Sequence, residues 1–129
     1  PIGIFLGCKY TDPTSNQMTF NQTWPASTSA SDAAAYVLVD PNVLFQMQGD
    51  ETVAQAALGA NAAVVQTAGS TSIGNSKNAF DGSTVATTNT LPVKVVDFVE
   101  GPTSTVGDTY TDVIVKFNVG HQLTNTTGI

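Results

Sequence analysis

Two apolar segments separated by a polar turn, within residues 35–50, form the clearest pattern of hydrophobic and polar positions in the chain. The turn is Asp40-Pro41-Asn42, where proline fixes φ and the flanking Asp and Asn side chains can bond their own backbone. After the turn, apolar and polar residues alternate as in a strand with one buried face, whose inward set is Val43, Phe45 and Met47. The pattern predicts a β-hairpin or a tight β-corner inside an all-β domain.

Alternation elsewhere predicts further short strands. In residues 2–8 we expect Ile2, Ile4, Leu6 and Cys8 on one face, and residues 112–119 alternate in the same way. Other strands are expected to begin at Met18 and to span residues 60–67, 78–81 and 93–100. About seven or eight short strands separated by turn signals predict a small barrel or a sandwich-like domain.

One short helix is expected over residues 51–58. Asp50 could cap its N-terminus, Glu51 would lie favourably in the first turn, and Gly59 suits a left-handed C-terminal cap. A helix of barely two turns is marginal without tertiary support.

The length of 129 residues fits one domain, residues 1–129, which we expect to be barrel-like. Residues 120–129 lack periodicity and are expected to form an extended C-terminal arm. The sequence begins at Pro1 without an initiator Met, so we expect that N-terminal residues were processed away or lie outside it.

The small number of charges and the negative net charge disfavour nucleic acid and anionic membranes as partners. Only 11% of residues are charged, the four basic residues are all lysine, and the net charge is −6. A dispersed set of four lysines does not suit nucleic acid or an anionic membrane, and no apolar run approaches the roughly 20 residues of a membrane span. A surface of neutral polar residues suits protein–protein packing, because burying charges is costly.

Few residues are suited to catalysis or metal binding. His121 is the only histidine and Cys8 the only cysteine, so a multi-histidine metal site and structural zinc are excluded. A Ser-His-Asp triad would need His121, and the Gly-x-Ser-x-Gly motif is missing. We expect a hydrogen-bonding role for His121 and a buried, inert thiol for Cys8. We predict no catalytic, cofactor-binding or metal-binding residue, and no enzyme.

Two carboxylate pairs, Asp50-Glu51 and Asp108 with Asp112, are the candidates for glycosidase chemistry, which needs only two such groups. Their places at element edges favour capping and turn formation, although Asp108 and Asp112 could also ligate calcium. The Gly-rich residues 69–74 lack the ending of a phosphate loop, which favours a plain surface loop. The aromatic residues could form a sugar platform but are expected to be core or interface anchors: Tyr10, Trp24, Tyr36 and Tyr110.

Several short segments resemble a group of tailed-bacteriophage structural proteins, especially those of marine and cyanobacterial phages. The resemblance begins with Gly3-x-Phe5-x-Gly7-Cys8-x-Tyr10-x-Asp12-Pro13. It continues along most of the chain through these segments: Met18-Thr-Phe20, Trp24-Pro25, Asp32-Ala33, Ala35-Tyr36-Val37, Asp40-Pro41, Phe45-Gln46-Met47-Gln48, Gly59-Ala60-Asn61, Ala68-Gly69-Ser70-Thr71 and Phe117-Asn118-Val119-x-His121-Gln122.

The resemblance implies a virion component, most often a capsid decoration or cement protein with a β-barrel-like domain. It implies location on the outer capsid surface, the major capsid protein as partner, and a homotrimer. The members tend to have a longer N-terminal region, so the strand count given above is a lower bound. The alternative from the residues is a carbohydrate-binding module on a phage tail or head appendage, with Trp24 or Tyr110 as stacking platform.

Contacts with partners are expected through loops and chain ends, because these carry spare backbone groups that neighbours can bond. In the C-terminal arm, Leu123 and Ile129 are the expected apolar anchors. The expected contact segments are residues 11–17, 26–34, 67–76, 101–108 and 120–129.

Overall fold

The computed structural model describes residues 3–118, and its fold is all-β, as predicted. Nine strands lie in the described residues, all in antiparallel sheets: β1 (Ile4–Thr11), β2 (Met18–Asn21), β3 (Ala34–Leu38), β4 (Phe45–Gln48), β5 (Asn61–Ala62), β6 (Val64–Val65), β7 (Ala79–Phe80), β8 (Val93–Phe98) and β9 (Asp112–Phe117). Two short 3₁₀ helices, η1 (Gln55–Ala57) and η2 (Gly82–Thr84), join them. The sheets have the orders β2-β1-β3, β4-β9-β8-β5 and β6-β7.

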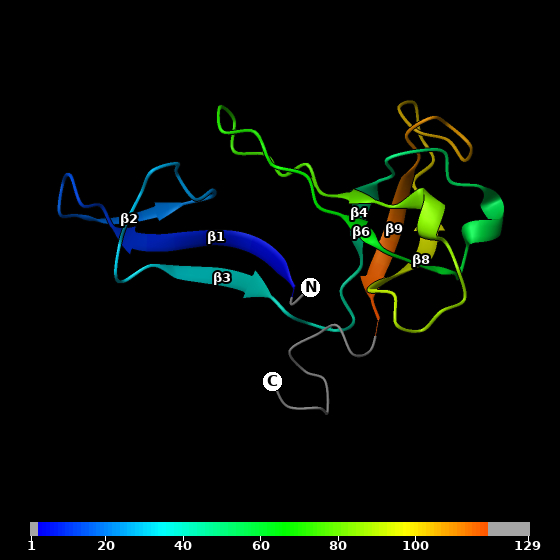
Figure 1. Ribbon diagram of the computed structural model, residues 1–129, viewed down its shortest axis with the longest axis horizontal. Coiled ribbons are helices and arrows are strands. Elements are labelled where there is room, and N and C mark those ends of the chain that lie inside the picture. Colours follow the sequence, from blue (N-terminus) through cyan, green and yellow to red (C-terminus); the bar gives the residue numbers. More distant parts are fainter. Residues whose placement is uncertain (1–2, 119–129) are drawn as a thin grey trace.

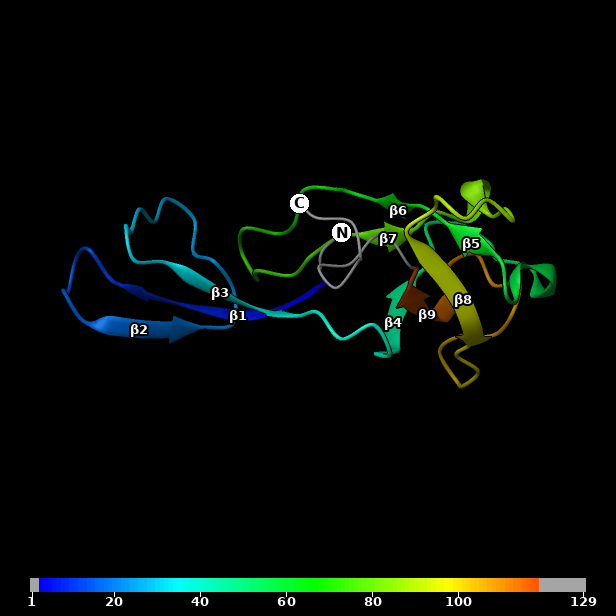
Figure 2. The same ribbon diagram turned by 90° about the horizontal axis from the view of Figure 1, so that it is seen from below.

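The molecule is elongated, with two visibly different parts (Figures 1 and 2). Strands β1, β2 and β3, within residues 4–38, form a separate layer that projects to one side, and we call it the N-terminal sheet. Residues 45–118 form the body. Ile4 packs against the core of the body, and the backbone of Gly74 lies so close to Thr23 that an added Cβ would come within 2.6 Å of its side chain.

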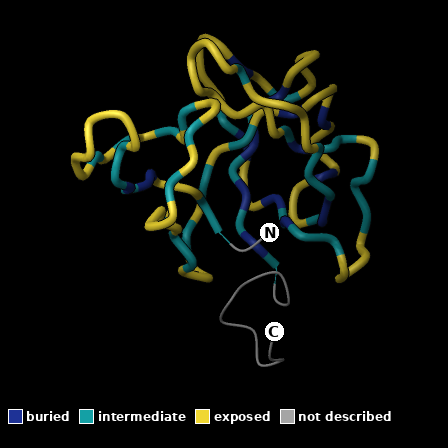
Figure 3. The backbone as a smooth tube through the Cα atoms, turned by 60° about the vertical axis from the view of Figure 1, so that its left-hand side comes forward, coloured by how far each residue is buried: buried dark blue, intermediate teal, exposed yellow. Residues whose placement is uncertain are grey.

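The body has the main hydrophobic core, where buried segments gather (Figure 3). Strand β9 turns Val113, Val115 and Phe117 inward, and both valines are fully buried, as the alternation predicted. Phe80 on β7 is also fully buried. Thr111, the most deeply buried polar side chain of the described residues, is satisfied because its hydroxyl accepts from the Val53 N–H and donates to the Asp108 carbonyl.

The N-terminal sheet has a much smaller buried set. In residues 3–38 only Cys8 and Tyr10 have buried side chains, and the edge of the Trp24 ring packs on Tyr10 at a centroid distance of 5.2 Å. The prediction that Leu6 shares the buried face of Cys8 is wrong. The register between β1 and β3 shifts between Phe5 and Gly7, so Leu6 is an extra residue at a bulge and is exposed.

The predicted turn at Asp40 forms, but the hairpin does not. The Asn42 N–H donates to the Asp40 carboxylate and the Val43 N–H to the Asp40 carbonyl. Strand β3 pairs with β1 while β4 pairs with β9, so the turn connects two different sheets. Each strand thereby gains a longer partner, and Phe45 and Met47 still pack on the core as the alternation required.

The expected helix is also shorter than predicted. Only Gln55–Ala57 is helical, its N-cap residue is Ala54, and the Asp50 carboxylate accepts instead from the Gly82 N–H. Gly59 does adopt the predicted left-handed conformation, with φ of +79°. The predicted strand over residues 60–67 divides into β5 and β6, which belong to different sheets.

The predicted C-terminal arm, His121, Leu123 and Ile129 lie outside the described residues. Strand β9 ends at Phe117. Within residues 101–108, an expected contact loop, Ser104 is buried and Val106 packs on the core, so part of this loop is used internally. None of the helices described by the structure is long and apolar enough to cross a membrane.

Candidate functional site

The carboxylates singled out from the sequence serve mainly local structure. Asp108 accepts from the Thr105 N–H at 2.8 Å, and Asp112 accepts from the Gln46 side-chain amide at 3.0 Å. These contacts fit the turn and edge roles expected for both residues. Residues 69–74 form a turn closed by backbone bonds between Ser70 and Gly74 and between Ser70 and Asn75, as expected of a plain loop.

One acidic cluster was not anticipated. Asp50, Glu51 and Asp81 each place a carboxylate oxygen within 4.8 Å of the others, which brings together groups 30 residues apart. Asp50 accepts from the Gly82 N–H, while Asp81 accepts from the Ser83 N–H and hydroxyl. Asp81 therefore caps the start of η2, and Asp50 ties η2 to the loop that follows β4, which accounts for the positions of both carboxylates without a cation.

Asp32 was also missed as a structural residue. Its carboxylate accepts from the Thr11 hydroxyl and from the Thr11 N–H, so it continues the pairing of β1 where β3 has not yet begun. These hydrogen bonds, the hydroxyl first, lower the pKa of the Asp32 carboxyl below its usual 3.8. A fixed negative charge thus lies at the end of the N-terminal sheet.

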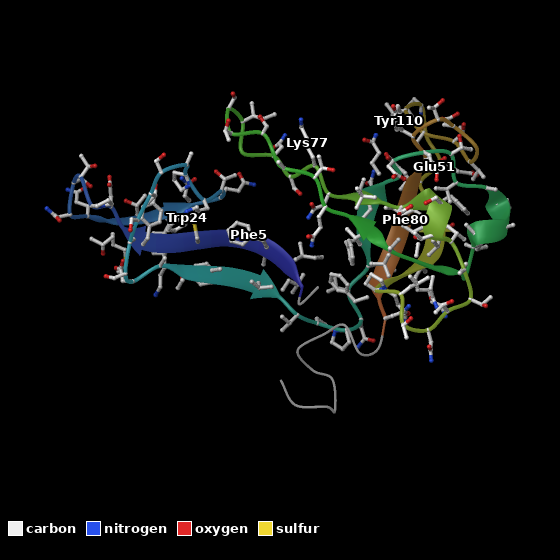
Figure 4. All side chains as sticks on the ribbon, in the orientation of Figure 1. Phe5, Trp24, Glu51, Lys77, Phe80 and Tyr110 are labelled. Carbon is white, nitrogen blue, oxygen red and sulfur yellow. The ribbon has the colours of Figure 1, made fainter. Side chains whose placement is uncertain are left out.

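The four aromatic residues proposed as a sugar platform are not gathered on one face. Trp24 lies on the N-terminal sheet and Tyr110 on the body, well separated in Figure 4. Tyr10 is buried beneath Trp24, and Tyr36 lies on the opposite face of the sheet from Tyr10.

The most unusual surface of the described chain is the N-terminal sheet itself. Seven of the twelve exposed large hydrophobic side chains belong to it, although it holds fewer than a third of the residues. Phe20 is 68% exposed and Met18 62%. A three-stranded layer normally buries one face against another element, and this one is covered only by the Trp24 loop. The exposed set is Phe5, Leu6, Met18, Phe20, Trp24, Tyr36 and Val37.

A recess of about 320 Å³ opens on one face of this sheet, which we call the Trp24 recess. The Phe5 and Trp24 rings flank it, and its lining is otherwise Cys8 and three alanines, Ala33, Ala34 and Ala35. The Cys8 thiol is engaged with the carbonyls of Asn21 and Thr23. The recess therefore offers apolar contact and few polar partners, which suits an apolar side chain better than a sugar.

A second open depression, of about 530 Å³, lies on the outer face of β8 and β9, and we call it the lysine groove. Leu44, Leu58 and Val96 supply its exposed apolar side chains, between 39% and 53% exposed. Lys94 and Lys116 line the same groove and are directly opposite each other in the antiparallel register.

Two like charges in direct cross-strand opposition are unfavourable in an isolated sheet. Neither lysine side chain has a hydrogen bond or an ion pair among the described residues. Asp97 and Asp112 lie on the same outer face farther along the strands, where each already accepts a hydrogen bond, from the Phe98 N–H and from Gln46. In a chain with four basic residues, half of the positive charge is therefore placed beside an apolar groove.

No protein-family model, curated protein or solved structure matches this chain significantly. The geometry thus provides two surfaces suited to association: an apolar sheet with a carboxylate at its end, and an apolar groove with two lysines.

Proposed function

We propose that this protein is a bacteriophage capsid decoration protein, which binds the outer head surface and stabilises contacts between major capsid subunits. The observation that supports it most is the N-terminal sheet, whose exposed apolar side chains project from a separately packed body. By the register, Met18, Phe20 and Tyr36 lie on one face of the sheet and Phe5 and Val37 on the other. Isolated soluble domains rarely leave so much apolar surface uncovered, and exposed apolar surface of this kind marks interaction sites. The choice of the major capsid protein as the partner rests on the sequence resemblance to phage structural proteins.

The physical basis of cementing is mass action. A protein that binds only the assembled lattice stabilises it by the free energy of binding, and repeated copies add their effects. The sparse charge of the surface favours this role, since little desolvation opposes packing on a neighbour. A homotrimer around a threefold position would repeat one contact in a closed ring. No chemical step is required of the protein.

The test is the position and effect of the protein in virions that carry it. We expect it on the outer head surface in reconstructed images of purified particles. We also expect heads lacking it to release DNA at lower temperature. Density confined to the tail would contradict the capsid location, and heads of unchanged stability would contradict the cementing role.

The alternative role, a carbohydrate-binding module, is supported by one observation, the 43% exposure of the Trp24 ring. It requires that glycans bind the purified protein and that Trp24→Ala removes this binding. Absence of glycan binding, together with a Trp24 ring covered by a protein neighbour in the virion, would exclude it.

A further inference from the structure

We propose that the outer edge of β3 pairs with the same edge of a second copy of this chain, as two antiparallel strands around a twofold axis. This β3 edge is the side of Ala34–Leu38 that faces away from β1. The inference goes beyond the proposed function, because the contact needs no capsid. It uses only the edge of the N-terminal sheet and leaves both of its faces free for another partner.

The β3 edge is open in the described part of the chain. Strand β3 is the last strand in the order β2-β1-β3, and its only ladder is with β1 (Figure 1). In residues 3–118, no hydrogen bond joins the outward backbone groups of β3 to another segment, and Ala35, Tyr36 and Val37 are exposed. An antiparallel partner on one side satisfies only about half of the N–H and C=O groups of a strand. The other groups are left to water or to a further strand.

The sequence of β3 has none of the features that discourage such pairing. Soluble proteins usually protect an open edge with a charged residue, a proline or a β-bulge. Residues 34–38 include no charge and no proline, and the bulge at Leu6 lies on β1 instead. The flanking carboxylates, Asp32 and Asp40, lie beyond the strand, and each accepts hydrogen bonds within its own chain. The edge is therefore suited to an added strand.

The order of side chains in β3 identifies a second copy as the added strand. In an antiparallel self-pair, all residues of β3 find a partner only when Tyr36 lies opposite Tyr36 of the other copy. Ala34 then lies opposite Leu38, and Ala35 lies opposite Val37. A small side chain thus meets a large one on either side of the axis, and two aromatic rings meet on the axis itself. No pair brings like charges together.

The other edge of the sheet, strand β2, lacks this complementarity. Self-pairing of β2 would place Met18 opposite Asn21 and Thr19 opposite Phe20, so each apolar side chain would meet a polar one. The paired segment would also be shorter than that of β3. The side-chain pattern therefore favours the β3 edge for contact between copies.

The second copy would also complete the Trp24 recess. Ala35 lines the recess and belongs to the edge strand. Pairing places the partner's Val37, which is 40% exposed in the single chain, directly beside Ala35 on the same face. The partner's Phe5 follows in the same row, because Phe5 is opposite Val37 in the register of β1 with β3. The recess thereby gains an apolar wall from another molecule.

A twofold contact between identical edges is closed, so it joins two copies and does not continue as a filament. It is compatible with the homotrimer of the proposed function, because an edge contact can join two rings without using either face of the sheet. The two three-stranded layers then form one continuous sheet.

Charge substitutions at Tyr36, which is 46% exposed, test the pairing of the full chain by analytical ultracentrifugation. Tyr36→Lys and Tyr36→Glu each place like charges directly opposite each other on the axis, so each alone should weaken association about tenfold or more. Mixed in equal amounts, the two variants should associate again, because Lys then faces Glu. The controls are Phe20→Lys and Phe20→Glu, which make the same charge changes on the same face of the sheet but on β2. They should leave association unchanged.

A disulfide tests the register. Tyr36→Cys places two cysteines opposite each other, within the Cα separation of about 4.4–6.8 Å that a disulfide requires, so mild oxidation should give covalent dimers. Val37→Cys is the control, because residue 37 lies opposite Ala35 and two cysteines at this position are farther apart. The native Cys8 is buried and is present in both variants.

Four results would each overturn the proposal: a wild-type chain that does not associate, equal effects of charge at Tyr36 and Phe20, no association in the mixture of Tyr36→Lys and Tyr36→Glu, or equal cross-linking of Tyr36→Cys and Val37→Cys. Recovery in the mixture also shows that both charged variants are folded. These measurements need no virion, so their failure is distinguishable from failure of the capsid role.

Discussion

The body and the N-terminal sheet are built from the same kinds of residue, yet the body buries its apolar side chains and the sheet leaves most of them exposed. In the body, the four-stranded sheet is covered on its inner face by β7, η1 and the connecting loops, and its valines are fully buried. The N-terminal sheet is a single layer in which the Trp24 loop covers only Cys8 and Tyr10. Strand-forming residues are thus sufficient to make a sheet, whereas burial needs a second layer. For the N-terminal sheet, we infer that the second layer comes from another molecule.

The largest expected effect is the difference in the free energy of unfolding between two matched phenylalanine substitutions, one in each part. Phe80→Ala should lower the free energy of unfolding of the body by about 3–5 kcal/mol, because it empties the centre of the core. Phe20→Ala, at a 68% exposed position of the sheet, should change it by less than about 0.5 kcal/mol in the dilute monomer. Urea unfolding measures both, and comparable losses would contradict the distinction between the two parts.

The second test concerns Trp24, the main internal cover of the N-terminal sheet. Trp24→Ala should destabilise that sheet by about 1–3 kcal/mol, because it exposes Tyr10 and Cys8. The single cysteine is a convenient probe, and its rate of reaction with a thiol reagent should rise about tenfold or more as local opening becomes easier. Unfolding of the body, followed by a probe in β8 or β9, should be unaffected. An unchanged thiol rate would mean that Trp24 does not cover the sheet.

The sequence could predict the parts whose structure is set locally. The alternation of β9, the Asp40 turn and the left-handed Gly59 all depend on neighbouring residues, and each is found in the structure. The pairing of β3 and β4 could not be inferred in this way, because the partner strands β1 and β9 are remote from the turn. The bulge at Leu6 changed the exposed face of β1 for the same reason, since it arises from the register with β3.

Less of the candidate surfaces than of the fold could be predicted from the sequence. Lys94 and Lys116 are separated by a long connection, and only the register of β8 with β9 places them opposite each other. Asp50 and Asp81 come together through a bond to Gly82 that competes with the predicted helix cap. A signal for the apolar sheet was present, because residues 2–24 carry several large apolar side chains with few charges. No local pattern, however, shows whether a second layer of the same chain packs on these side chains.

A third, smaller effect tests the contact between the two parts. Gly74 and Gly107 both have positive φ, +73° and +90°, so Ala at either position incurs backbone strain of about 1 kcal/mol. Only at Gly74 would the new Cβ also meet Thr23 of the N-terminal sheet. Gly74→Ala should therefore increase the reactivity of Cys8, while Gly107→Ala should not. Equal reactivity in the two variants would show that the loop contact does not hold the sheet.

The smallest expected effect is a pH dependence at Asp32. Its pKa is lowered in the folded chain, so its contribution to stability is present above 3.8 and is lost as the pH falls through the lower folded value. Protection of the Thr11 amide from hydrogen exchange, corrected for the intrinsic rate, should decline on acidification from about pH 6 to about pH 3. Asp32→Asn should flatten this dependence. A pH dependence that persists in the variant would assign it to other carboxylates.

The central claim is that the N-terminal sheet is completed by association while the body is complete by itself. Hydrogen exchange of the full chain, compared between dilute monomer and assembled protein, tests it most directly. The account predicts that assembly slows exchange in β1, β2 and β3 and leaves the slow exchange of the inner β8–β9 pairing unchanged. Equal exchange of β1–β3 in both states, or protection gained mainly in the core of the body, would contradict it.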